Sequence, residues 1–469
     1  MLLTRGLVGV AAAALLVFAA QQARAETLES ALVKAYGNNP QLNAQRAGVR
    51  ATDEGVSRAQ AGYRPKISVS GEIGAQTSNY RIPNPLFGTS VTQQRTIVTH
   101  TGIVPRGAQA QLTQTLFDSG ATSNNVRQAE SLVLSARETL RNTEESVLFN
   151  GAQSYMNVLR DTATLDLQKS NVDVLEEQLR QTRDRFNVGE VTRTDVAQAE
   201  SRLEGAHSQV SAAQATLKAD IATYRQTIGV EPKTLAPGRP IDRLLPATLD
   251  GAVRIAFAEN PAIVSAFHSV DAAELAVKVA EAALGPNVSL QALVSGQNDF
   301  KVSNDQLLNA QVTATLTMPI YQGGAEYAAI RQAKETLGQQ RLLADQVRDA
   351  VRQAVVASWG NLDASKAQIL AAQAQISASE VALNGVREEA KVGQRTTLDV
   401  LNAQQDLLNA RVALVSAQHD RVVNSYALLQ GVGRLTLEYV SPRSEKYDPG
   451  NHYQQVRDLW WGTQVPNGH

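Results

Sequence analysis

Residue types that carry out enzyme chemistry are either absent from this 469-residue sequence or scattered along it. The chain has no cysteine, which excludes thiol nucleophiles, thiolate metal sites and disulfides. Its histidines show no metal-ligand spacing, and they lie at positions 100, 207, 268, 419, 452 and 469. It has no Walker A, GxSxG or HExxH motif. We therefore predict no catalytic site, no metal and no cofactor, and a protein that is not an enzyme.

The most specific polar motif is a short glycine-centred segment that occurs twice. It reads Val188-Gly189-x-x-Thr192 in the first half and Val392-Gly393-x-x-Thr396 in the second. Glycine commonly ends an α-helix and threonine commonly begins one. Gly189 and Gly393 are therefore predicted to mark the tips of two helical hairpins.

These two motifs belong to an internal repeat. A shift of 204 residues also relates Asp195 to Asp399 and Gly229 to Gly433. It holds over more than 100 residues, which two unrelated alanine-rich helices would not do. We divide the chain into a signal sequence (1–25), a first repeat (26–229), a proline-rich linker (230–250), a second repeat (251–433) and a tail (434–469).

The first repeat carries an insertion. Earlier in each repeat the shift is larger, because Pro40 corresponds to Pro261. The extra residues must lie between Pro65 and Phe117, and we place them between about Gln76 and Gly107, where the first strand would connect to the second. We expect a loop there, because this segment contains Pro83, Pro85 and Pro105. If the chain forms an outer-membrane barrel, this loop would face the exterior, because the longer loops of such barrels lie on that side.

Each repeat contains two segments of about ten residues in which apolar and polar residues alternate, as in β-strands. They begin near Lys66, Ala108, Val288 and Ala310. Periodicity alone favours a half-buried sheet in a soluble protein, and the alternative is a transmembrane β-barrel. Aromatic residues where strands meet helices, namely Tyr63, Phe117 and Tyr321, favour the barrel.

The N-terminal segment 1–25 also favours export from the cytoplasm. Arg5 precedes an apolar stretch over residues 7–20, and Ala23-Arg24-Ala25 forms a small-residue cleavage site. This pattern is typical of a secretory signal, so we expect the mature chain to begin at Glu26; a retained membrane anchor is the alternative. The net charge of −1 provides no basic field for nucleic acid.

Two helical segments follow the strands of the first repeat. Residues 121–187 and 192–228 contain no proline and have apolar residues every seven positions, such as Leu165, Val172 and Leu179. The first segment would extend about 100 Å. The shorter helices 40–62 and 192–228 together match its length, so we expect them to stack end to end beside it.

Four strands cannot close a barrel, and lipid does not tolerate an open sheet edge. A chain that spans the membrane must therefore oligomerise. A dimer would give eight strands, which fill their own interior, so a pore requires a trimer or more.

The sequence resembles the TolC family of outer-membrane efflux channels. The resemblance covers about residues 26–433. Its motifs are Phe186-Asn187-Val188-Gly189-Glu190-Val191-Thr192, Val392-Gly393-Gln394-Arg395-Thr396, Leu116-Phe117-Asp118 and Pro319-Ile320-Tyr321-Gln322-Gly323-Gly324. It implies an α+β membrane protein: a homotrimer with a 12-stranded transmembrane β-barrel, continued in the periplasm by an α-helical coiled-coil barrel. The absence of cysteine implies the non-lipidated branch.

The resemblance also implies residues for a periplasmic gate. Asp399 matches a position in a ring of carboxylates, and Arg395 matches a basic residue that links the inner hairpin to a neighbouring one, with Thr194 and Asp195 as its partners. Two departures weaken this gate: Asn402 replaces a second ring carboxylate, and Ala390 replaces a linking tyrosine.

The resemblance implies that a periplasmic adaptor docks on the two hairpin tips. These positions are Val188, Gly189, Thr192, Val392, Gly393 and Thr396. Solvated charges and helix caps are the alternative interpretation of the gate and the tips.

By this resemblance the chain is a passive exit duct in outer-membrane lipid. It would join an adaptor and an inner-membrane ABC or proton-driven transporter to the exterior. We expect it to export a secreted protein, as in type I secretion, with small-molecule or drug efflux as the alternative. The alternative of another class is a periplasmic coiled-coil adaptor, which usually has one hairpin and no membrane strands.

Overall fold

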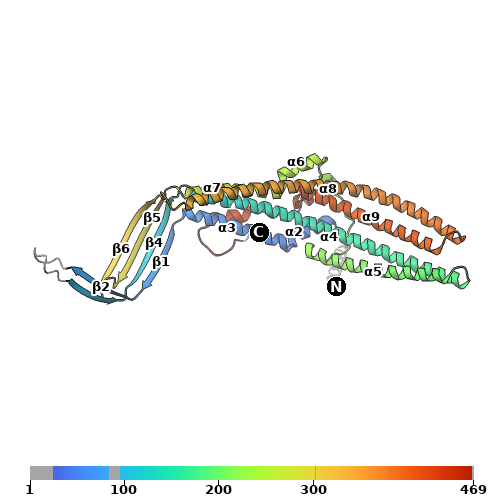
Figure 1. Cartoon of the computed structure of the whole chain (residues 1–469), viewed down its shortest axis with the longest axis horizontal. Helices are drawn as coiled ribbons and strands as arrows, with labels where there is room; N and C mark the ends of the chain where they lie inside the picture. Colours follow the sequence, from blue (N-terminus) through green and yellow to red (C-terminus); the bar gives the residue numbers. More distant parts are fainter. Residues whose placement is uncertain (1–24, 84–95, 302, 467–469) are drawn as a thin grey trace, which may run out of the picture.

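The computed structural model of the chain is elongated, with β-strands at one end and long helices over the rest of its length (Figure 1). It describes residues 25–83, 96–301 and 303–466. The predicted signal sequence, apart from residue 25, and Pro85 lie outside these ranges. No helix in the described ranges is long and apolar enough to cross a membrane.

Four strands form one antiparallel sheet in the order β1-β4-β5-β6. They are β1 (Lys66–Ile73), β4 (Arg106–Phe117), β5 (Asn287–Asn298) and β6 (Gln306–Thr317). The repeats meet where β4 pairs with β5. Among the described residues, β1 and β6 have no partner on their outer sides. The four predicted strands are confirmed, and their sheet is open at both edges.

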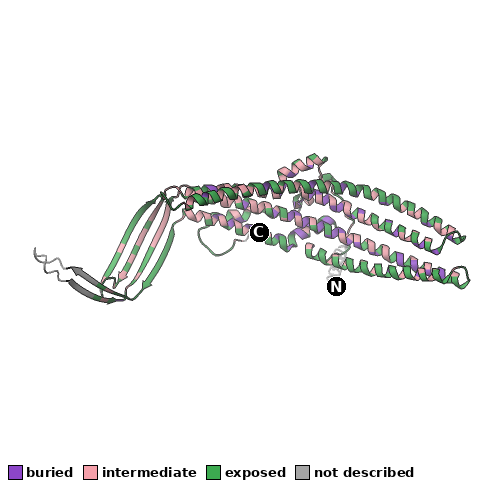
Figure 2. Cartoon of the chain, viewed as in Figure 1, coloured by how far each residue is buried: buried purple, intermediate pink, exposed green. Residues whose placement is uncertain are grey.

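Both faces of this sheet are uncovered in the single chain. Ile67 and Val69 of β1 and Val312 of β6 are exposed, and none of the four strands contains a buried residue (Figure 2). In a soluble sandwich a second layer would cover one face. The chain has no such layer over its described residues, so this sheet is not the half-buried sheet that periodicity alone favoured.

The insertion of the first repeat is a β-hairpin and not only a loop. The strands β2 (Gln76–Pro83) and β3 (Thr96–Ile103) pair with each other beyond the end of the main sheet (Figure 1). The prediction of a loop is therefore wrong for these two segments. Pro83 is the last residue of β2, a position at which proline interrupts little of the ladder, and β3 is rich in threonine, isoleucine and valine.

The helical body consists of two hairpins and two shorter pairs of helices. Hairpin 1 is α4 (Ala121–Asn187) with α5 (Arg193–Ile228), and hairpin 2 is α8 (Ala325–Lys391) with α9 (Thr397–Val432). The shorter helices are α2 (Leu28–Asn38), α3 (Pro40–Gln60), α6 (Leu249–Glu259) and α7 (Pro261–Ala282). The long helix predicted over 121–187 is confirmed.

In each repeat an Asn-Pro pair places a shorter helix end to end with the return helix of the hairpin, α3 with α5 and α7 with α9. The side chain of Asn39 caps α3 by accepting from the backbone N–H of Gln41, and its amide donates to the carbonyl of Thr227 in the last turn of α5. Asn260 caps α7 and donates to the carbonyl of Gly431 in the same way. One asparagine side chain therefore provides a hydrogen bond to a free N–H group at the start of one helix and to a free carbonyl group at the end of another.

This junction predicts a strong effect of Gly433→Ala. Gly433 has φ +87°, and an added Cβ would lie 2.5 Å from Cα of Asn260. An alanine held in the left-handed backbone conformation, together with this clash, should lower the free energy of unfolding by roughly 2–4 kcal/mol. The midpoint of thermal unfolding should therefore fall by several degrees. Helical circular dichroism measures this. Gly360→Ala in α8, where nothing lies within 4 Å, should leave the midpoint unchanged or raise it.

The predicted heptads pack inside each hairpin. Leu165, Val172 and Leu179 are buried on α4, and Ala199 and Ala206 are buried on α5. Small alanines opposite large residues let the helices approach closely. Phe186, which continues the same series, is exposed because it lies at the hairpin tip.

Candidate functional site

The free ends of the two hairpins contain nearly all the predicted site residues. α4 ends at Asn187, and Val188 and Gly189 form the turn, with Gly189 at φ +81°. Val392 and Gly393 form the second turn, with Gly393 at φ +79°. Positive φ favours glycine, so the two tip glycines are explained by backbone geometry.

Each return helix begins with a capping box. Thr192 and Asp195 hydrogen-bond each other's backbone N–H groups at the start of α5, and Thr396 and Asp399 do the same at the start of α9. These hydrogen bonds hold the pKa of both carboxyls below the usual range. For Asp195 the largest cause is the Thr192 hydroxyl, and for Asp399 it is the backbone N–H of Thr396. Both carboxylates are ionised at neutral pH and fixed at a helix start.

One ion pair bridges each turn, with the charges exchanged between the repeats. Arg185 before the first turn pairs with Glu190 after it at 3.0 Å, and Glu389 before the second pairs with Arg395 after it at 2.9 Å. Glu389 is the main cause of a raised pKa of Arg395. These two pairs were not predicted, although the spacing of Arg185, Glu190 and Glu389 across a predicted turn could have indicated them.

The single chain does not bring Arg395 to Thr194 or Asp195. In the described residues Arg395 bonds within its own hairpin, while Asp195 is occupied by Thr192. The predicted link would have to form between hairpins of different protomers, and it stays a prediction.

A different contact joins the two hairpins within one chain. The guanidinium of Arg202 on α5 donates to the side-chain oxygen of Asn402 on α9 at 2.9 Å. Leu401 beside it is buried against Val172 and Ala199 of hairpin 1. Asn402, expected only as a missing ring carboxylate, therefore accepts a bond from the other hairpin.

A groove of about 650 Å³ separates the hairpins near their tips. It is lined by α4 and by both helices of hairpin 2, and Ala390 and Val400 form part of its wall. The methyl group of Ala390 provides no hydrogen bond across it. Whatever holds the hairpins together here must use other residues, and Arg202 with Asn402 is such a pair.

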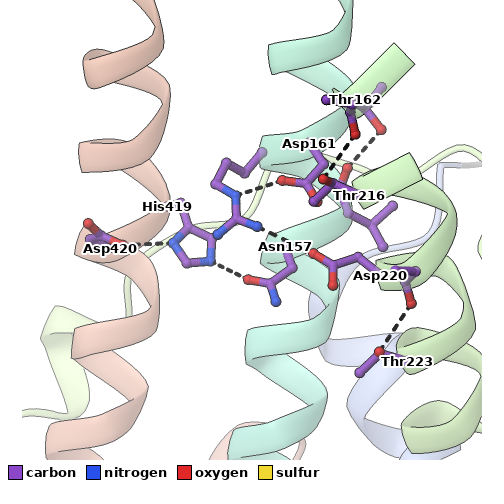
Figure 3. A network of polar contacts seen from close by, with 12 residues as sticks. Asn157, Asp161, Thr162, Thr216, Asp220, Thr223, His419 and Asp420 are labelled. Carbon is purple, nitrogen blue, oxygen red and sulfur yellow. Dashed lines mark hydrogen bonds and ion pairs between the residues drawn. The ribbon is translucent and has the colours of Figure 1, made fainter. Parts of the chain in front are cut away.

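A second polar network lies away from the tips, between α4, α5 and α9 (Figure 3). His419 contacts Asn157 and Asp420, each at 2.8 Å, and Arg160 contacts Asp161 at 2.7 Å. Asp220 faces Asp161 across the α4–α5 contact (Figure 3), and the guanidinium of Arg160 lies 3.3 Å from the carboxylate of Asp220. Burial, followed by the hydrogen bond with Asp161, raises the pKa of Asp220 to about 6, although Arg160 opposes the shift.

The close approach of Asp161 and Asp220 predicts that the stability of the fold depends on pH. Asp220 has a higher pKa in the folded chain than unfolded, so the folded state binds the proton more tightly and gains stability as pH falls from 7 towards 5. Asp220→Asn should lose this gain and equal or exceed the parent's unfolding temperature at pH 7.5. Thermal unfolding at pH 7.5 and 5.5 measures this. Asp166→Asn, on the exposed side of α4, should keep the parent's pH dependence, and an unchanged dependence in Asp220→Asn would contradict the assignment.

The chemistry available at these sites is ion pairing and hydrogen bonding between helices. No group of three or more potential metal ligands occurs among the residues that the structure describes. Such contacts can hold helix ends together and release them, which suits a mechanical closure.

Comparison with known proteins supports the family expectation. A family model described as outer membrane efflux protein matches residues 31–230 and 252–434, and so covers both repeats. The outer membrane efflux protein BepC of Brucella suis is 43% identical to the chain, over 98% of this chain and 97% of BepC.

Two further similarities are more distant. The alkaline protease secretion protein AprF of Pseudomonas aeruginosa is 27% identical over 66% of each chain. The crystal structure of the Campylobacter jejuni CmeC outer membrane channel superposes with a TM-score of 0.74 at 17% identity, covering 92% of this chain and 89% of CmeC. This last similarity concerns the fold.

Proposed function

The chain belongs to the outer membrane efflux protein family, and from this premise we propose that it is the exit duct of a tripartite export system. Proteins of this family lie in the outer membrane, with the helical part in the periplasm. A periplasmic adaptor, the alternative of another class, is excluded by this membership and by the two tandem hairpins.

The observation that carries the proposal is a four-stranded sheet with two open edges and two uncovered faces, continued directly by long helices. Three copies give twelve strands, enough to close a barrel with an aqueous interior. The four helical tracks of each chain are α3 with α5, α4, α7 with α9, and α8, so three copies also give a ring of twelve tracks. A homotrimer would therefore close the strands into a barrel at one end of the molecule and the helices into a ring at the other.

An exposed apolar stripe on α8 supports the same assembly. This α8 stripe consists of Leu342, Val356, Leu370 and Val381. Successive members lie about three or four whole helical turns apart, so their side chains share one side of the helix. We assign this side to the contact with the next protomer.

The hairpin tips are the proposed docking site for the periplasmic adaptor and, with it, an inner-membrane ABC or proton-driven transporter. Val188 and Val392 are exposed there beside the two tip glycines. At the other end of the molecule, the β2–β3 hairpin is proposed to face the exterior.

Two substrate classes are supported by different relatives. Efflux is supported by the 43% identity to BepC, which is named an outer membrane efflux protein. Secretion of a protein, the expectation from sequence, is supported by AprF, which is named a protease secretion protein. We propose efflux as the first candidate, because the BepC similarity is higher and spans the whole chain, and protein secretion as the second.

Purified protein in planar lipid bilayers tests the duct. Trimers should conduct ions, and outer-membrane fractions should contain the chain. Trimers that insert but never conduct would contradict the proposal. In cells that lack the gene, lost resistance to small apolar compounds indicates efflux, and lost release of a protein into the medium indicates secretion.

A further inference from the structure

The C-terminal tail runs along α3 towards the sheet. It contains α10 (Leu437–Val440) and α11 (Gly450–Val456), and α11 packs beside α3 (Figure 1). The backbone N–H of Tyr447 donates to the hydroxyl of Tyr36 at 3.1 Å. Tyr36 lies on α2, and later parts of the tail contact Asp53 and then Ser57 on α3, so the tail passes from α2 along α3 to the end of that helix.

A buried pair fixes the middle of the tail. Nδ1 of His452 lies 3.0 Å from Oδ2 of Asp53, and both side chains are shielded from solvent. Arg137 of α4 lies 4.0 Å from the same carboxylate and places its guanidinium 5.1 Å from the ring centre of Tyr453. A buried polar pair of this kind specifies one position along the helix, because a displaced tail would leave Asp53 without this partner.

Arg64 holds the end of the tail at the junction of helix and sheet. Its guanidinium donates to the carbonyl of Leu459 at 2.6 Å and lies 5.0 Å from the ring centre of Trp460. Ser57 donates to the same carbonyl at 3.3 Å. Arg64 precedes the first residue of β1 by two positions, roughly 7 Å of extended chain, so the end of the tail is held close to the start of the sheet.

Two large aromatic side chains project from this position. Trp460 is 62% exposed and Trp461 is 86% exposed, although both are tethered by the contacts of their neighbours. Tyr63, which precedes Arg64 in the chain, is exposed too, and the exposed apolar side chains of β1 begin at Ile67. The tryptophans therefore adjoin the surface that faces lipid in the proposed barrel.

We propose that Trp460 and Trp461 form a membrane anchor that enters the headgroup region of the leaflet facing the periplasm. Tryptophan favours this region because its ring is apolar and its N–H finds polar partners. The headgroup region is roughly 5–8 Å thick on each side, which the tail can reach from the junction. Arg64 adds a positive charge suited to lipid phosphate. The inference rests on the proposed barrel.

Tryptophan fluorescence tests the anchor, because the chain has only three tryptophans, at 359, 460 and 461. The Trp359→Phe variant reports the tail alone, in vesicles of phosphatidylethanolamine and phosphatidylglycerol containing nitroxide-labelled lipids. We expect shallow labels to quench its emission more than deep ones, and aqueous acrylamide to quench it weakly. The variant with Trp460→Phe and Trp461→Phe is the matched control. It keeps Trp359 on the helical body, and lipid labels should not quench it.

Several outcomes would overturn the anchor. Strong quenching by acrylamide without quenching by lipid would place the tryptophans in water. Protection from both quenchers would place them against a neighbouring protomer. Each result overturns the anchor alone if the same sample conducts ions in a planar bilayer, and a sample that fails to insert overturns the proposed barrel as well. If Trp359→Phe does not fold, Trp359→Tyr replaces it.

His452→Ala tests the positioning of the anchor by the tail. It removes the partner of Asp53 without touching either tail tryptophan. In the Trp359→Phe background it should reduce quenching by shallow lipid labels at least twofold, while conductance stays unchanged. Quenching equal to that of Trp359→Phe alone would show that the buried pair does not place the tryptophans.

Discussion

Leu370→Glu is expected to stop the chain from assembling into trimers. Leu370 lies in the middle of the α8 stripe and is 69% exposed in the single chain. A carboxylate there is solvated in the monomer, so the fold should form. At a closed interface the same carboxylate is buried without a partner, which costs several kcal/mol, and a trimer repeats that cost three times.

Mass photometry in detergent measures this effect. The parent should be mainly trimeric, and Leu370→Glu should be mainly monomeric with an unchanged helical circular dichroism spectrum. Gln368→Glu is the matched control, because it adds the same charge to the same helix about 200° away from Leu370. Trimers of parent stability in Leu370→Glu would show that the α8 stripe does not form the interface.

Contacts between residues close in the sequence were predictable. The capping boxes follow from Thr192 and Asp195, which are three residues apart, and the two tip glycines follow from the same motif. The long helices follow from heptads uninterrupted by proline. The β2–β3 hairpin was missed because proline was taken to exclude a strand, whereas Pro83 occupies the end of one.

Contacts between distant residues were not predictable. Arg202 and Asn402 are 200 residues apart, and the repeat offers no help, since its shift of 204 relates Arg202 to Asp406. The tail could not be placed for the same reason. His452 meets Asp53 across 399 residues, and only the folded body brings them together.

Arg395→Ser is expected to raise single-channel conductance by opening the periplasmic end. The family resemblance implies that Arg395 would link its hairpin to Thr194 or Asp195 of a neighbouring hairpin, and this link stays a prediction. The structure adds that Arg395 also pairs with Glu389 and that Asp195 caps α5. Asp195→Gln is therefore a better partner variant than alanine, because glutamine at this position can keep the capping box while it removes the charge.

Combined variants separate the proposed link from general damage to the tips. Arg395→Ser and Asp195→Gln should each raise conductance, and the double variant should add little, since both break one link. Arg185→Ser is the matched control. It removes the corresponding ion pair from the tip of hairpin 1 and should leave conductance near the parent value. An equal increase in Arg185→Ser would show that any loosened tip opens the channel.

Arg202→Ala completes this series because its contact lies within one protomer. The hydrogen bond to Asn402 is exposed and contributes about 0.5 kcal/mol, and a trimer repeats it three times. The closed state should lose roughly 1.5 kcal/mol, about a tenfold change in the ratio of open to closed channels. Arg202→Ala and Arg395→Ser break different contacts, so their effects on this ratio should multiply. If Arg202→Ala leaves conductance unchanged while Arg395→Ser raises it, closure depends on contacts between protomers and not on the junction of the two hairpins within each.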